Sequence, residues 1–240
     1  MAAQAPRNQP QDAQNLYDSR ASNYDNSWHH RFARHMVELA ELRPGEHVLD
    51  LACGTGLVTY PASTAVGPTG NVVGIDISSG MLARAKAKRA AHESRNVAFY
   101  QHSITDLPAL PELEGMVFDV IICASALVLL DDPSEALRLW TTYLKFGGRL
   151  ITHSPHPASQ ISLIIFGRVG QVLGRPVPFY RVPFQTPEDL RVMVEEAGLS
   201  SVEVVLMSQK NIAGTDALEA YRGDPKHLRI ENTYSIADAD

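Results

Sequence analysis

The sequence has few of the features that mark secreted or membrane-spanning proteins. It contains only two cysteines in 240 residues, Cys53 and Cys123, which are too few for a disulfide framework and favour a reducing compartment. No window approaches the ~18 uncharged apolar residues of a membrane span. The polar N-terminus has no apolar stretch like that of a signal peptide. We therefore expect a cytoplasmic protein without a membrane span.

An excess of basic residues is also missing. The formal net charge is -6, and the sequence pI is about 5.8, so phosphate backbones would not be attracted diffusely. The fourth predicted strand is followed by "CASALV" and not by an N/D-P-P-Y/F tetrapeptide, which would stack a flipped base. We expect a small-molecule substrate and no nucleic-acid partner, and the sequence makes no prediction of the oligomeric state.

Short β-branched runs alternate with helix-like segments along most of the chain. The runs cover residues 46–52, 71–77, 97–103, 118–125 and 147–153. A capping Asp132 followed by Pro133, and Thr186 followed by Pro187, predict two helix starts. This alternation predicts an α/β fold: a Rossmann-like, doubly wound, mostly parallel sheet.

The predicted domain organisation is a single domain with three parts. Residues 1–45 would form an N-terminal helical lid, and residues 46–209 the Rossmann-like domain. Residues 154–185, apolar and punctuated by glycine and proline, are longer than a simple strand-to-helix loop and would form a cap between the fifth strand and the following helix. Residues 210–240 would be a tail that contributes, at most, a last strand.

The stretch "DLACGTG" at residues 50–56 predicts a ligand loop at the end of the first strand. A dinucleotide fingerprint would have a third glycine where Thr59 stands, and no acid at Asp50. A carboxylate there favours a ligand with an ammonium group, such as S-adenosylmethionine. Asp76, at the end of the second run, stands where an acid that accepts ribose hydroxyls is expected.

Five segments, in order, resemble a known family. They are "VLDLACGTG", "VVGIDISSGMLARAKAK", "FYQHSITDLP", "FDVIICASALVLLDDPSEALR" and "LKFGGRLIT". Residues 46 to about 155 thereby resemble the class I S-adenosylmethionine-dependent methyltransferases, in particular the small-molecule group that includes the ubiquinone and menaquinone biosynthesis C-methyltransferases. The resemblance implies an enzyme with S-adenosyl-L-methionine as its cofactor and S-adenosyl-L-homocysteine as the product.

The resemblance also implies which residues bind the cofactor. The loop and strand residues on the methionine side would be Asp50, Ala52, Cys53, Gly54, Thr55, Gly56 and Cys123. The residues on the nucleoside side would be Asp76, Ile77, Met81, Ser103 and Ile104. The family usually has an acid where Ser103 stands, so that contact would be weaker here. Within "YDSRASNYD", Tyr17 and Tyr24 would fold over the cofactor as lid contacts.

Methyl transfer is an in-line displacement that depends on positioning, and no metal is expected. A base would be needed only to remove a proton from the acceptor, and histidine suits that task near neutral pH. His153 is the first candidate because it ends the fifth strand at the carboxyl edge of the sheet. His156 and His29 are further candidates.

The cap points to the chemical class of substrate. No acidic residue occurs between Ala136 and Pro187, whereas Arg168, Arg175 and Arg181 lie within the cap. A small, largely apolar metabolite, possibly anionic, would match such a lining and fits secondary metabolism. One alternative is a protein that binds S-adenosylmethionine without transferring a methyl group, either cyclase-like or a regulatory subunit. A nicotinamide-dependent oxidoreductase is the other.

Overall fold

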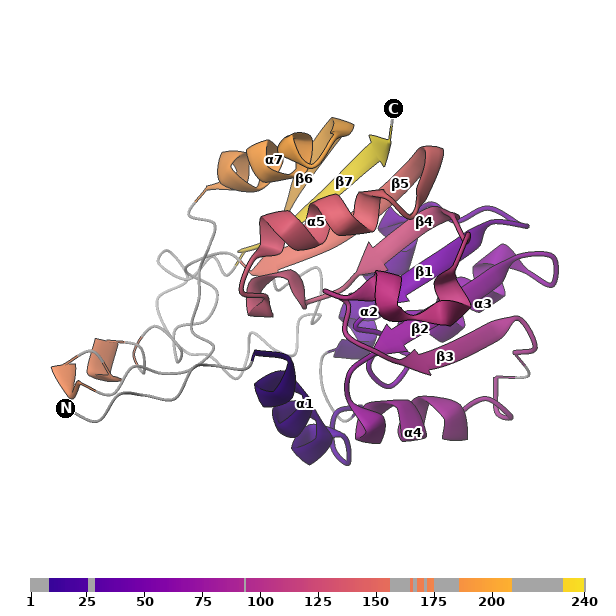
Figure 1. The fold of residues 1–240 in the computed structure, drawn as a ribbon, viewed down its shortest axis with the longest axis horizontal. Coiled ribbons are helices and arrows are strands. Elements are labelled where there is room, and N and C mark those ends of the chain that lie inside the picture. Colours follow the sequence, from indigo (N-terminus) through magenta and orange to yellow (C-terminus); the bar gives the residue numbers. More distant parts are fainter. Residues whose placement is uncertain are drawn as a thin grey trace.

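A computed structural model describes most of the chain. The described residues are 9–25, 29–92, 94–155, 165, 168–170, 172–174, 186–208 and 231–239. Within these residues, seven strands form one sheet in the order β3-β2-β1-β4-β5-β7-β6 (Figure 1). The strands are β1 (His47–Leu51), β2 (Asn71–Asp76), β3 (Val97–Gln101), β4 (Phe118–Cys123), β5 (Leu144–Pro155), β6 (Leu199–Ser208) and β7 (Glu231–Ala239). The predicted α/β, mostly parallel sheet is therefore confirmed.

Strands β1 to β5 pair in parallel, whereas β7 runs antiparallel to both of its neighbours. The last strand is therefore inserted between β5 and β6 and does not lie at an edge. All five predicted runs contain a strand. β5 continues through Pro155, two residues into the segment predicted as the cap. Most of that segment, including Arg175 and Arg181, lies outside the described residues.

Helices cover both faces of the sheet (Figure 1). They are α1 (Gln9–Arg20), α2 (His29–Leu39), α3 (Thr59–Val66), α4 (Ser79–Ala87), α5 (Pro133–Thr141) and α7 (Pro187–Glu196), with short 3-10 turns η1 (Leu107–Ala109), η2 (Pro111–Leu113) and η3 (Leu127–Leu129). Within the described residues, each helix is too short or too polar to cross a membrane.

Alternation along the strands divides the core into two layers. Leu49 of β1 and Ile121 of β4 pack with α5, α7 and the 3-10 turns. Their neighbours in the same strands, Val48 and Ile122, point to the other face and pack with α2, α3 and α4. Trp140 of α5, fully buried, anchors the first layer. Both faces are thus apolar, which is why the strands read as nearly continuous hydrophobic runs.

The helix starts follow the predicted capping signals. The Asp132 side chain accepts the N–H of Glu135 at 2.9 Å to cap α5. Thr186 and Asp189 form a reciprocal capping box at α7, with bonds of 2.8 and 3.2 Å. These side chains satisfy N–H groups that the first helical turn leaves without a partner, so both starts are fixed locally.

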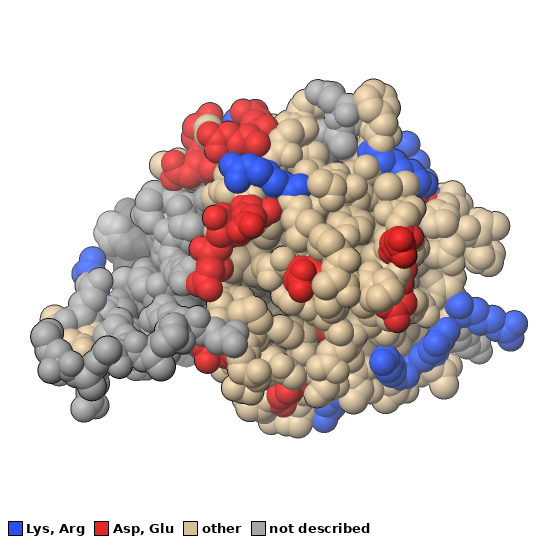
Figure 2. Space-filling model, viewed as in Figure 1, with Lys and Arg blue, Asp and Glu red and all other residues tan. Residues whose placement is uncertain are grey.

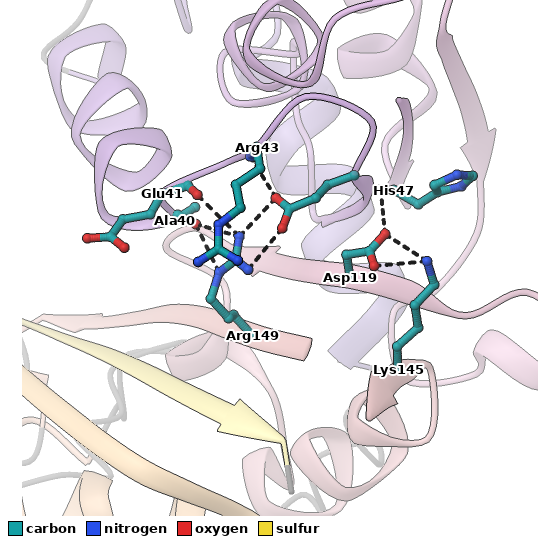
Figure 3. Close-up of polar contacts among 8 residues, drawn as sticks. Ala40, Glu41, Arg43, His47, Asp119, Lys145 and Arg149 are labelled. Carbon is teal, nitrogen blue, oxygen red and sulfur yellow. Dashed lines mark hydrogen bonds and ion pairs between the residues drawn. The ribbon is translucent and has the colours of Figure 1, made fainter. Parts of the chain in front are cut away.

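Two polar clusters lie toward the amino ends of the strands (Figure 3). The Arg149 guanidinium pairs with Glu46 at 2.9 Å and donates to the carbonyls of Ala40 and Glu41, just after α2. Lys145 pairs with Asp119 at 2.8 Å, and Asp119 also accepts the backbone N–H of His47. The first cluster therefore connects the end of α2 to strand β5.

Candidate active site

A pocket lies at the carboxyl ends of β1, β2 and β4, beneath α1 and the turn that follows it. Among the residues that line it, those expected from sequence are Tyr17, Tyr24, Ala52, Gly54, Asp76, Ile77, Met81, Ser103 and Ile104. The others are Gln9, Pro10, Ala13, Thr105, Ala124, Ser125, Ala126, Leu129 and Leu130. The structure thus brings together residues from the N-terminal segment and from four strand ends.

Asp76 joins the second strand to the glycine loop. One carboxylate oxygen accepts the N–H of Gly54 at 2.7 Å, and the other accepts the N–H of Ser78 at 2.8 Å. Burial raises the pKa of Asp76, and these backbone N–H groups act in the opposite direction. A carboxylate has about four lone-pair sites, so two occupied sites leave acceptor capacity toward the pocket.

Two lining residues have left-handed backbones although neither is glycine. Ala52, which follows β1, has φ 56°, and Ser125, two residues beyond β4, has φ 65°. Residues with side chains rarely adopt this conformation, and they cluster at functional sites. The pocket wall between β1 and β4 is therefore shaped by strained turns at both strand ends.

The N-terminal strap, defined here as residues 9–25, covers the pocket. Hydrogen bonds hold it in place at its first residue and near its middle. The Gln9 side-chain amide donates to the carbonyl of Leu129 at 2.8 Å. The Asp18 carboxylate accepts the Ser78 hydroxyl at 2.5 Å and the N–H of Gly80 at 2.9 Å. Asp18 therefore binds the first turn of α4, beside which α1 lies (Figure 1).

The strap is fastened a third time at Asp25. This carboxylate accepts the Thr55 hydroxyl at 2.5 Å and pairs with Lys88 at 2.6 Å. The same lysine donates to the Thr55 carbonyl at 2.9 Å. Helix α4 ends at Ala87, and the side chain of the next residue, Lys88, contacts both the strap and the glycine loop.

Similarity to known proteins identifies the family of this chain. A family model described as a methyltransferase domain matches residues 42–169. A ubiquinone/menaquinone biosynthesis C-methyltransferase from Proteus mirabilis is 33% identical over 196 residues, covering 75% of this chain and 76% of that protein. This chain is a class I S-adenosylmethionine-dependent methyltransferase.

Further similarities agree with this family. An aklanonic acid methyltransferase from Streptomyces sp. is 32% identical over 142 residues, covering 58% of this chain and 63% of that protein. A crystal structure of a methyltransferase from Aquifex aeolicus has the same fold, with a TM-score of 0.61 at 16% identity, covering 93% and 98% of the two chains. The methyltransferase described here therefore uses S-adenosylmethionine and acts on a small molecule, and the matches give no support to the two alternatives.

The pocket fits this cofactor chemically. Asp76 offers carboxylate acceptors for hydroxyl groups, while Ile77 and Met81 supply apolar surface beside it. Gly54 has φ 55°, and a Cβ there would lie 4.0 Å from the Tyr24 ring, so strap and loop approach closely. This part of the pocket therefore combines one acid with apolar walls, the combination that a ribose and an adenine would require.

Asp50 lies beneath the pocket wall and does not line it. Its carboxylate accepts the hydroxyl of Thr59 at 2.5 Å. Burial raises the pKa of Asp50 to about 7, although hydrogen bonds from Thr59 lower it. Asp50 and Thr59 are the two residues that distinguished this loop from a dinucleotide fingerprint, and they are therefore bound to each other at the start of α3.

The remaining loop and strand residues expected on the methionine side lie behind the wall. Cys53 is buried, and its N–H donates to the Ile75 carbonyl at 3.0 Å. The carbonyl of Cys123, expected near the methionine, accepts the Thr152 hydroxyl at 3.2 Å. Thr55 is bound to the strap, and Gly56 has φ 82° beside Tyr60. These four are not among the lining residues.

The three histidines predicted as candidate bases lie in different surroundings, and neither of the two that the structure describes lines the pocket. His153 is buried behind Ser125, and burial lowers its pKa to about 3. That environment disfavours the imidazolium that a general base must become, which argues against His153 as the base. His29 stacks on Tyr24 at 4.4 Å between ring centroids, outside the pocket lining, and burial lowers its pKa to about 4. His156 lies outside the described residues.

Ser125 and the two strap acids, Asp18 and Asp25, were not among the site residues predicted from the sequence. Ser125 was within the quoted stretch after the fourth strand, and its place beyond a strand end at the ligand edge was the available signal. Asp18 and Asp25 directly follow the two predicted lid tyrosines. The repeated Tyr-Asp pair in residues 17–25 was therefore the signal for an acid that binds the strap next to each aromatic contact.

Proposed function

We propose that the pocket binds S-adenosylmethionine with its nucleoside along β2 and its methionine over the glycine loop. Asp76 would accept the ribose hydroxyls, and Ile77 and Met81 would pack against adenine. Ser103 and Ile104 would contact the adenine edge, with Tyr17 and Tyr24 closing the strap over the cofactor. The buried Asp76 carboxylate at the pocket wall carries this assignment, because it is the acid that the described lining offers to a ribose.

The bound cofactor supplies an electrophilic methyl group on a sulfonium sulfur. For this chain's residues, the task is to hold the acceptor in line with that group at about 3 Å and to exclude water. Ala124, Ala126, Leu129 and Leu130 form an apolar wall that suits both purposes. Positioning and a dry site are thus the contributions that these residues make.

The acceptor that fits this wall is a small, largely apolar metabolite bearing an oxygen function, ionised or neutral. Support comes from the apolar side chains at the end of β4 and from two relatives whose names refer to quinone biosynthesis and to aklanonic acid. Such acceptors are common in secondary metabolism, and a cytoplasmic location suits the two buried free cysteines. Among the described residues on the face in Figure 2, acidic and basic side chains are interspersed, which favours a small molecule over nucleic acid.

Calorimetry tests the cofactor assignment. We expect S-adenosylhomocysteine to bind the wild type and NADH not to bind. Asp76→Asn should weaken S-adenosylhomocysteine binding at least about tenfold, because a charge-assisted hydrogen bond is lost. Glu112→Gln, a change to an exposed acid far along the chain, is the matched control and should leave the affinity unchanged. Tight NADH binding together with indifference to S-adenosylhomocysteine would contradict the assignment.

Acceptor class is tested separately, by mass spectrometry of products formed from S-adenosylmethionine. The panel should contain a 1,4-naphthohydroquinone unsubstituted at carbon 2, 1-hydroxy-2-naphthoic acid and a polar amine such as histamine. We expect methylation of the naphthalene compounds and none of the amine. The reverse preference would reject the apolar, oxygen-bearing acceptor while leaving the cofactor assignment intact.

A further inference from the structure

Ser125 occupies an unusual place in the pocket. Its backbone is left-handed, with φ 65°, although it is not a glycine. Such strain persists only where the surrounding structure imposes it, and it is concentrated at functional sites. The conformation holds Ser125 in the pocket wall, two residues beyond β4.

The neighbours of Ser125 in that wall are apolar. Ala124, Ala126, Leu129 and Leu130 surround it along the chain. The other hydroxyls of the strand-end lining, Ser103 and Thr105, bond to each other at 2.8 Å, at the end of β3. Ser125 is therefore a polar group inserted into an apolar surface, at the side of the pocket away from β3.

A buried histidine holds the Ser125 side chain from behind. The Ser125 hydroxyl lies 3.4 Å from Nδ1 of His153. The imidazole is itself fixed by the edge-to-face contact with Phe32 of α2, at 4.8 Å between ring centroids. The next strand residue before it, Thr152, donates to the Cys123 carbonyl at 3.2 Å and so connects β5 to the end of β4. The direction of the hydroxyl is thus set by three elements that meet behind the wall.

We propose that Ser125 binds the methyl acceptor, its hydroxyl forming a hydrogen bond with the oxygen function of the acceptor, and that His153 is a positioning residue that orients this hydroxyl. The inference rests on the proposed function, because it places the acceptor over the apolar wall. It assigns to the serine–histidine pair a role in binding and orientation, with no proton removed by the imidazole.

Burial explains why the pair orients and does not take a proton. A neutral imidazole forms a hydrogen bond with a hydroxyl through Nδ1 without carrying charge. Burial lowers the pKa of His153 to about 3, so the ring stays neutral near pH 7. An acceptor that needs deprotonation would accordingly enter the pocket already ionised.

The test combines Ser125→Ala, His153→Phe and the double variant in the full chain. Phenylalanine keeps an aromatic ring against Phe32 but removes both ring nitrogens. Ser154→Ala is the matched control, since it deletes a buried hydroxyl on the opposite face of β5 that does not line the pocket. The probes are S-adenosylhomocysteine alone and, on the protein loaded with it, 1-hydroxy-2-naphthoic acid.

We expect Ser125→Ala to weaken naphthoate binding, or kcat/KM if it is methylated, about tenfold. His153→Phe should act in the same direction, and the double variant should cost no more than the larger single change because the two residues act as one unit. S-adenosylhomocysteine affinity should stay within about twofold in every variant.

Several results would overturn the proposal. Additive losses, an equal loss in Ser154→Ala, or a parallel loss of S-adenosylhomocysteine affinity would each do so. If the wild type loaded with S-adenosylhomocysteine binds no naphthoate, the acceptor class of the proposed function is wrong. The 15N resonances of the His153 ring then test the contact between Ser125 and His153. Ser125→Ala must shift them, and unchanged resonances would reject the contact.

Discussion

Lys88 and Asp25 form an ion pair of 2.6 Å that closes the N-terminal strap over the glycine loop. Both side chains are about a quarter exposed, and the Thr55 hydroxyl shares the same carboxylate. Burial alone would raise the pKa of Asp25, but the hydrogen bonds from Lys88 and Thr55 hold it below its usual value. The charged form of Asp25 is therefore what fastens the strap.

Asp25→Asn should loosen the strap and weaken S-adenosylhomocysteine binding about three- to tenfold, because the pair contributes modestly in partly exposed surroundings. The loss should shrink at high salt, which screens the pair in the wild type. Calorimetry at two salt concentrations measures both effects. Lys145→Met, which breaks a comparable pair with Asp119 at the other end of the sheet, should leave the affinity unchanged. Equal effects of the two variants would contradict this role.

Gly74→Ala should destabilise the fold by about 1–3 kcal/mol through overpacking. A Cβ at this position of β2 would lie 2.9 Å from the Phe99 ring and 3.0 Å from the Cys53 sulfur. Urea unfolding gives the change in the free energy of unfolding. Phe99→Leu added to Gly74→Ala should cost less than the sum of the two single changes, since the smaller side chain makes room. Strict additivity would show that the crowding lies elsewhere.

Asp50 should make the unfolding free energy fall as pH rises from about 4 to about 7. Burial raises the pKa of Asp50 in the folded state to about 7 from its ordinary value of 3.8, so the folded state keeps a proton that the unfolded state has released. The total decrease due to Asp50 should be on the order of 2–4 kcal/mol over this pH range, and Asp50→Asn should abolish it. Urea unfolding at several pH values checks it, and parallel curves for both proteins would contradict the prediction.

Arg149→Met should destabilise the fold by about 2–4 kcal/mol, since it leaves Glu46 without its cation and the end of α2 without a donor. Both side chains of the pair are only 13% exposed. Lys145→Met provides the comparison: its pair with Asp119 is more exposed, at 38% and 27%, and should contribute less than about 1 kcal/mol. Urea unfolding of both variants measures the difference, and similar losses would show that burial does not decide it.

Local signals in the sequence predicted most of the fold. The caps at Asp132 and Thr186 act within one helical turn, and strand patterns report burial of both faces, so neither depends on distant residues. The glycine loop and Asp76 could be predicted for the same reason, because each follows directly from a strand end.

Contacts between distant segments could not be read from the sequence. The Asp50 carboxylate was expected to face the ligand, but it is bound to the Thr59 hydroxyl instead. The burial of His153 behind Ser125 depends on Phe32, which is more than one hundred residues earlier in the chain. Lys88, the residue after α4, pairs with Asp25 on the strap, more than sixty residues earlier. In each case, a tertiary partner determined what local propensity left open.

The position of β7 between β5 and β6 has a consequence for how the molecule is made. A ribosome makes residues 231–239 after the other six strands of the sheet, yet these residues supply the ladder that joins β6 to the rest of it. The nascent protein can therefore assemble β1 to β5 before β7 is made, but the complete sheet must await residues 231–239. Shortening the chain by this one strand would leave β5 with an open edge and β6 without a neighbour.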